Sequence, residues 1–104
     1  MSTYDIQITK PAEEDLHEIG FYISKELLEP DTAKKVISKI AKVINSLEDM
    51  PLRNPLVLDE RLAKMDIRRI MADNFIVFFI LSEKSRTVTI IRILYNRRNW
   101  LNLI

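Results

Sequence analysis

The side chains of this chain that are best suited to chemistry are a set of cations in its second half. Arginine carries a planar fork of N–H donors that matches the oxygens of a phosphate, and clustered guanidinium groups are stabilised when an anion binds between them. On neighbouring strands, side chains that share a face lie about 5 Å apart. The residues concerned are Arg61, Lys64, Arg68, Arg69, Arg92, Arg97 and Arg98. They predict an anion-binding surface, with ordinary solvated strand faces as the alternative.

The distribution of charge also favours a polyanionic partner. Residues 1–60 contain seven Lys and Arg against twelve Asp and Glu, whereas residues 61–104 contain nine against three. The formal net charge of +1 hides this asymmetry. A basic surface gains affinity for a phosphate backbone by releasing counterions, while the acidic remainder favours solubility.

Tyr95 is the candidate for proton transfer or stacking. A phenol titrates at about pH 10 in isolation, and the nearby Arg92, Arg97 and Arg98 would favour its ionised form. It could act as a general base or stack on a nucleobase, or it could simply end the last strand.

The other polar groups are interpreted as surface features. The single histidine, His17, is expected to be solvated. Four carboxylates near the start of a helix are expected to interact favourably with the helix dipole: Glu13, Glu14, Asp15 and Glu18. Four lysines form the polar face of the next helix and are also expected to be solvated: Lys34, Lys35, Lys39 and Lys42.

Composition excludes several kinds of site. Because the chain has no cysteine, it has no disulfide, thiolate zinc site or cysteine nucleophile, and one histidine does not support a histidine-rich metal site. The single glycine, Gly20, excludes the glycine-rich loops that cradle nucleotide phosphates. We therefore expect neither a metal nor an organic cofactor.

Length and hydropathy predict one domain over residues 1–104. The chain is 47% hydrophobic and 30% charged, which suits a single compact core. Its longest apolar run, residues 75–81, is too short for a membrane span, and its N-terminus lacks a signal-peptide pattern. We expect a cytoplasmic protein with no membrane partner.

The periodicity predicts a strand, two helices and three strands. Residues 4–8 alternate as in a strand, and apolar stripes at helical spacing predict helices over 11–28 and from 31 to Pro51, joined as an antiparallel hairpin. Strands are predicted over 65–71, 75–81 and 87–94. The middle one is apolar on both faces, which is typical of a central strand covered on both sides.

The order of these elements, together with several short segments, resembles the RelE/ParE superfamily of toxins from bacterial type II toxin–antitoxin systems. The segments are IRRI at 67–70, NFIVFF at 74–79, IRILYNRR at 91–98, PAEEDL at 11–16 and INSL at 44–47. The resemblance spans nearly the whole chain. It implies a small α+β domain of order β-α-α-β-β-β, in which the N-terminal helix hairpin packs on a mainly antiparallel four-stranded sheet.

The resemblance implies one of two activities, because members of this superfamily are either mRNA interferases that cut messenger RNA on the ribosome or gyrase poisons of the ParE branch. As an interferase, the chain would use four residues for catalysis, namely Arg68, Arg69, Tyr95 and Arg97. Four more would bind RNA, namely Arg61, Lys64, Arg92 and Arg98. We expect the endoribonuclease activity first.

Two departures from the interferase pattern favour the alternative. Phe75 occupies the start of the central strand, where several interferases carry an arginine, and no C-terminal histidine is present. The alternative is a toxin that inhibits DNA gyrase by binding, without catalysis of its own. A degenerate, non-toxic member is the third hypothesis.

The resemblance also implies protein and nucleic-acid partners. A cognate antitoxin would wrap the helices and sheet, and we expect an acidic amphipathic segment to cover the arginines and an apolar groove. The toxin–antitoxin complex would bind operator DNA chiefly through the antitoxin.

Overall fold

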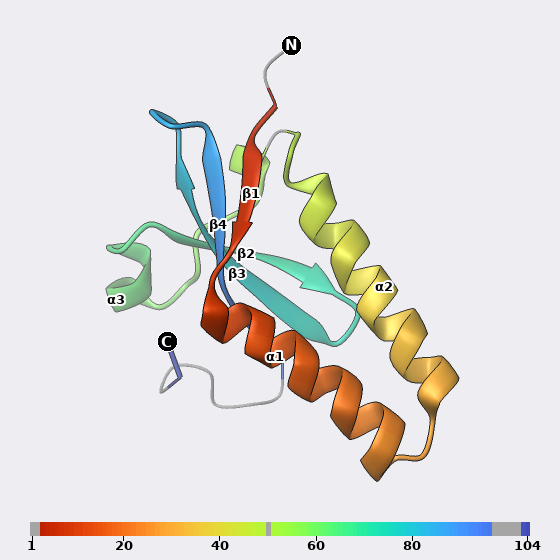
Figure 1. Cartoon of the computed structure of the whole chain (residues 1–104). Coiled ribbons are helices and arrows are strands. Elements are labelled where there is room, and N and C mark those ends of the chain that lie inside the picture. Colours follow the sequence, from red (N-terminus) through yellow and green to blue (C-terminus); the bar gives the residue numbers. More distant parts are fainter. Residues whose placement is uncertain (1–2, 50, 97–102) are drawn as a thin grey trace.

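The computed structural model describes residues 3–49, 51–96 and 103–104 as an α+β fold with the predicted element order. The main helices and strands are β1 (Asp5–Ile8), α1 (Lys10–Phe21), α2 (Pro30–Ser46), β2 (Ile67–Ala72), β3 (Phe75–Ser82) and β4 (Thr87–Tyr95). Three short helical pieces accompany them: η1 (Tyr22–Glu26), η2 (Pro51–Arg53) and α3 (Glu60–Ala63). Figure 1 shows the hairpin of α1 and α2 beside the twisted sheet.

The four strands form one mixed sheet in the order β1-β4-β3-β2. β1 runs parallel to β4, whereas β4, β3 and β2 are joined by antiparallel pairing. The mainly antiparallel four-stranded sheet that the resemblance implied is therefore confirmed.

β3 lies between β4 and β2 in the sheet, and both of its faces are buried. Val77 and Phe79 point into the core beneath the helices, and Ile76 and Phe78 point into a second core on the opposite face. Both phenylalanines are fully buried. This alternation explains why the sequence of β3 is apolar at almost every position.

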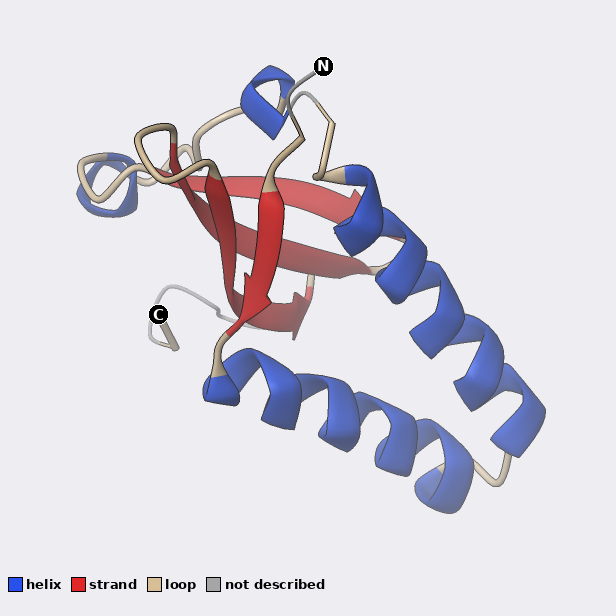
Figure 2. Cartoon of the chain, turned by 45° about the horizontal axis from the view of Figure 1, so that its top comes forward, coloured by secondary structure: helices blue, strands red, loops and turns tan. Residues whose placement is uncertain are grey.

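The helix hairpin covers one face of the sheet, as Figure 2 shows. α2 contributes Ile40 and Ile44 to the core, and α1 contributes Ala12. Thr9 caps α1, since its side chain accepts a hydrogen bond from the Ala12 N–H and its hydroxyl donates to the Ile90 carbonyl at 2.8 Å. The cap therefore ties the start of α1 to β4.

The connection between the helices departs from regular α-helix. The chain passes from α1 into the π-helical turn η1, and Leu28 then adopts a left-handed backbone with φ of 56°. Pro30 opens α2, where a missing N–H costs nothing. The predicted helix over 11–28 is thus an α-helix with a π-helical end.

The opposite face of the sheet is covered by smaller pieces. Leu62 of α3 packs with Val57, Ile67 and Phe78, and the C-terminal residues Leu103 and Ile104 lie against the same cluster. β2 starts two residues later than predicted, because α3 and a left-handed Asp66 precede it. In the described part of the chain, no helix is long and apolar enough to cross a membrane.

We expect Phe78→Ala to lower the free energy of unfolding by about 3 to 5 kcal/mol, because it removes a fully buried ring from the centre of the second core. Urea denaturation would measure the change. The control is Leu58→Ala, since Leu58 is 89% exposed and its truncation is expected to stay within about 0.5 kcal/mol of the parent. Equal effects of the two substitutions would contradict the assignment of this core.

Candidate functional site

The two adjacent arginines of β2 lie on opposite faces of the sheet. Arg68 pairs across the strands with Phe79, which faces the helices, and Arg69 pairs with Phe78, which faces the second core. Successive side chains of a strand alternate between faces, so Arg68 and Arg69 cannot converge on one phosphate while β2 stays regular.

Arg68 is engaged by the backbone before β2. Its Nη1 donates to the Asn54 carbonyl oxygen at 2.7 Å. The backbone N–H of Arg69 donates to the Pro55 carbonyl. Leu56 and Arg68 form an isolated antiparallel β-bridge. In this structure Arg68 fastens the 51–56 segment to the edge strand.

Arg92 forms a two-point ion pair with Asp15 of α1. Its Nε donates to Oδ2 at 2.8 Å and its Nη2 donates to Oδ1 at 2.9 Å. Its Nη1 donates to the Leu103 carbonyl at 2.7 Å. The hydrogen bond to Asp15 raises the pKa of Arg92 above its ordinary value, although burial acts in the opposite direction. The guanidinium therefore stays charged and has few donors left for another anion.

Asp15 is buried at the edge of β4, where its side chain accepts a backbone hydrogen bond from that strand. β1 pairs with β4 only as far as Ile8 and Ile90, so the next part of β4 has no neighbouring strand on that side. Asp15 Oδ2 accepts the Ile93 N–H there at 2.9 Å. A carboxylate that is only 6% exposed is thus satisfied by a backbone donor and an arginine.

The other predicted cations of the described chain belong to β2 and to α3 with its C-terminal cap. Arg69 is in one cross-strand row with Phe78 and Arg92, roughly 10 Å from Arg92 over two strand spacings. Arg61 and Lys64 are exposed at α3, and Lys64 lies 3.8 Å from the exposed Glu60. Arg97 and Arg98 lie outside the described residues. The catalytic and RNA-binding roles of these residues stay predictions.

Tyr95 lies on the helix side of the sheet, at the end of β4. Its ring meets Phe75 edge to face, with centroids 5.7 Å apart and an interplanar angle of 61°. Arg92 is on the other face and is held by Asp15, so it does not lie beside the phenol as the sequence analysis expected. Within the described chain, the Tyr95 side chain therefore contributes to aromatic packing.

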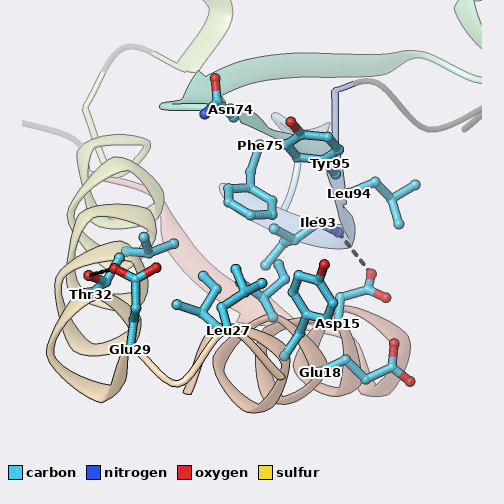
Figure 3. Close-up of a pocket in the computed structure, with 14 residues that line it drawn as sticks. Asp15, Glu18, Leu27, Glu29, Thr32, Asn74, Phe75, Ile93, Leu94 and Tyr95 are labelled. Carbon is cyan, nitrogen blue, oxygen red and sulfur yellow. Dashed lines mark hydrogen bonds between the residues drawn. The ribbon is translucent and has the colours of Figure 1, made fainter. Parts of the chain in front are cut away.

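A cavity of about 770 Å³ lies between the helix hairpin and the ends of β3 and β4. Figure 3 shows the rings of Phe75 and Tyr95 on the sheet side and Leu27 on the hairpin side. Its apolar lining is Ile19, Tyr22, Ile23, Leu27, Val36, Phe75, Ile93, Leu94 and Tyr95, and its polar lining is Asp15, Glu18, Glu29, Thr32 and Asn74. Within the described chain, no lysine or arginine lines it.

An apolar groove was expected from the sequence, but the carboxylates that line this cavity were not. The sequence analysis assigned Asp15 to the helix dipole, although Asp15 stands three residues after Ala12 and four before Ile19, on the apolar stripe of α1. A carboxylate in such a stripe signals a specific buried partner. The exposure of Tyr22 and Leu27, at 56% and 47%, depends on the hairpin geometry and has no comparable sequence signal.

The described residues provide no metal site. Among residues 3–49, 51–96 and 103–104, no three His, Cys, Asp or Glu side chains are grouped so as to hold a metal ion.

We expect Asp15→Ala to lower the free energy of unfolding by about 3 kcal/mol, because it leaves the Arg92 guanidinium and the Ile93 N–H without their acceptor. Denaturant titration would measure this change. The matched control is Glu18→Ala on the same helix, whose exposed carboxylate should contribute less than about 0.5 kcal/mol. A stability loss no larger than that of the control would contradict the role given to Asp15.

Comparisons with known proteins agree with this fold. The family model of the ParE toxin of the type II toxin–antitoxin system parDE matches residues 6–100. No curated protein sequence matches the chain.

Solved structures share the fold at low sequence identity. A chain of the chromosomal ParDE system from P. aeruginosa superposes with a TM-score of 0.73 at 19% identity, covering 89% of this chain and 96% of that one. A chain of a RelBE toxin–antitoxin complex from Mycobacterium tuberculosis gives 0.66 at 17% identity, with 89% and 98% covered. A mutant of the E. coli toxin RelE in the free state gives 0.63 at 10% identity, with 97% and 92% covered. The protein belongs to the ParE toxin family of type II toxin–antitoxin systems, within the RelE/ParE superfamily.

Proposed function

We propose that this toxin acts in the cytoplasm by binding DNA gyrase, and that it does not cut RNA itself. The observation that carries the proposal is the pairing of Arg92 with Asp15. The arginine expected beside Tyr95 is neutralised by a buried carboxylate. The match to the ParE family model, over residues 6–100, supports the same choice.

The distribution of the other groups also supports a binding toxin. Cutting RNA requires one site that activates the 2′-hydroxyl, stabilises charge on the phosphorane-like transition state and protonates the leaving oxygen. Tyr95 packs on Phe75 at the helix side, whereas Arg69 lies on the other face. Arg68 is on the helix side as well, but its Nη1 is engaged by the Asn54 carbonyl. Phe75 also stands where several interferases carry an arginine.

The second candidate function is the mRNA interferase. It is favoured by the position of Arg69 on the same face as α3, whose Leu62 packs into the second core. Arg61 belongs to that short helix and Lys64 is its C-terminal cap, so RNA binding on this side would not require Tyr95.

We expect purified toxin to inhibit supercoiling by gyrase and to accumulate cleaved plasmid, while messages in a coupled translation lysate stay intact. Agarose gels would follow the plasmid, and primer extension would map the ends of the messages. New message ends with an unaffected gyrase would contradict the proposal and support the interferase. In that case Arg69→Ala would show whether the face of the sheet opposite the helix hairpin carries the activity. No effect in either assay would support a degenerate member.

We further propose that the cognate antitoxin places an apolar segment carrying lysine or arginine in the cavity. The lining is mainly apolar, and its exposed charges are the carboxylates of Glu18 and Glu29. An acidic segment, as the sequence analysis expected, would bring like charges together there. A basic residue would pair with the rim while apolar side chains fill the floor between Tyr22 and Phe75.

We expect Glu18→Lys/Glu29→Lys to weaken binding of the purified cognate antitoxin at least tenfold, because the rim then repels a basic segment. Isothermal titration calorimetry would measure the affinity. The control is Glu83→Lys/Glu48→Lys, which makes the same change in net charge at exposed positions that do not line the cavity. Unchanged affinity of the rim variant, or an equal loss in the control, would contradict the proposed occupant.

A further inference from the structure

The exposed side of α2 presents a row of lysines that neither the toxin activity nor the antitoxin cavity uses. Lys34, Lys35, Lys39 and Lys42 are all exposed, and with Ser38 they line a shallow surface hollow of about 480 Å³. With a rise of about 1.5 Å per residue, the row extends roughly 12 Å along the helix. These four lysines and Ser38 are called the lysine face below.

The positive charge of the lysine face is poorly compensated. The acidic residue of α2 is Asp31, in the first turn. Lys39 pairs with Asp73 of the β2–β3 turn at 2.6 Å, whereas Lys34, Lys35 and Lys42 form no ion pair with another described residue. Cations three or four residues apart on a helix, such as Lys35, Lys39 and Lys42, repel one another. An approaching anion would remove this repulsion.

The lysine face is separate from the cavity between the helix hairpin and the sheet, in which we place the antitoxin segment. The two hollows share no lining residue, although both include residues of α2. The exposed acidic groups Glu13, Glu14 and Glu18 belong to α1, the other helix of the hairpin. A polyanion would therefore be attracted to the outer side of α2 and repelled by α1.

The chemistry of the lysine face fits a phosphate backbone better than a peptide. A peptide needs apolar anchors that fill pockets, and none of the exposed large hydrophobic residues of the described chain belongs to α2. Lysine ammonium groups act as mobile point charges, which suits sequence-independent contacts to phosphates. Ser38 adds a hydroxyl that can donate to a phosphate oxygen.

We propose that the lysine face of α2 binds the phosphate backbone of a nucleic-acid duplex. This goes beyond the proposed gyrase inhibition and beyond the expectation that operator DNA is contacted chiefly by the antitoxin. The lysines were expected from the sequence to form an ordinary solvated face. Their continuous alignment on one exposed helix side, without apolar anchors, points instead to a partner recognised by charge.

Fluorescence anisotropy with labelled duplex DNA and duplex RNA of one sequence tests the proposal directly. The purified toxin should bind at low salt, and the logarithm of its affinity should fall with the logarithm of salt concentration with a slope of about −3, as expected when three or four phosphates are contacted. Binding of DNA alone, RNA alone or both would support the proposal and identify the source of the phosphates. No binding of either duplex at low salt would overturn it.

The variant Lys34→Glu/Lys35→Glu/Lys42→Glu should lower the affinity at least tenfold. Lys39 is left intact because it fastens α2 to Asp73. The control Lys10→Glu/Lys25→Glu/Lys84→Glu has the same net charge, and its three exposed lysines lie outside the lysine face. An equal loss in the control would overturn the proposal, because net charge alone would then explain the binding.

A neutral variant, Lys34→Gln/Lys35→Gln/Lys42→Gln, is a control in case the charge-reversal variant unfolds, because glutamine is a good helix former. It should bring the salt slope close to zero. An unchanged slope would overturn the proposal. Neither gyrase nor ribosomes are present, so failure here would leave the proposed function of the toxin unaffected.

Discussion

The Asp15 carboxylate is the interaction on which the rest of the structure depends. β1 supports the edge of β4 only as far as Ile90, and beyond that point the side chain of Asp15 takes the place of a strand by accepting the Ile93 N–H. The same carboxylate holds Arg92 by two hydrogen bonds. These bonds lie in a poorly solvated place, where leaving any one of the groups unpaired is costly. One residue of α1 thus ties the helix hairpin to β4 beside the cavity that lies between them.

The toxin presents three surfaces that differ in chemistry. On the helix side, the apolar cavity with Glu18 and Glu29 at its rim fits a segment that is apolar and basic. On the outer side of α2, lysines face solvent without apolar neighbours, and they fit a partner recognised through its charge. On the other face of the sheet, Arg69 remains while Arg92 is occupied by Asp15. Protein partners and a polyanion could therefore bind the toxin at different places, which is compatible with a complex of toxin, antitoxin and nucleic acid.

Much of the fold could be predicted from local patterns, since these patterns have direct physical causes. The run at 75–81 is apolar on both faces because β3 is buried between two cores, and the stripes of α1 and α2 reflect their packing on one face. The candidate site was harder to predict. Adjacency of two cations in the sequence did not place them together in space, because alternation sends Arg68 and Arg69 to opposite faces. The parallel pairing of β1 with β4, which creates the need for Asp15, joins residues more than eighty positions apart and has no local signature.

The state of the Arg92 side chain in solution tests this view most directly. The Nε–H resonance of Arg92 can be followed by NMR while the toxin is titrated with an RNA oligonucleotide that cannot be cut, because its 2′-hydroxyls are methylated. If Arg92 is held by Asp15, the resonance should exchange slowly with solvent and keep its position throughout the titration. A resonance that shifts and loses its protection as RNA binds would show that the guanidinium is available to phosphate. That result would contradict the account of a binding toxin whose arginine is committed to the fold.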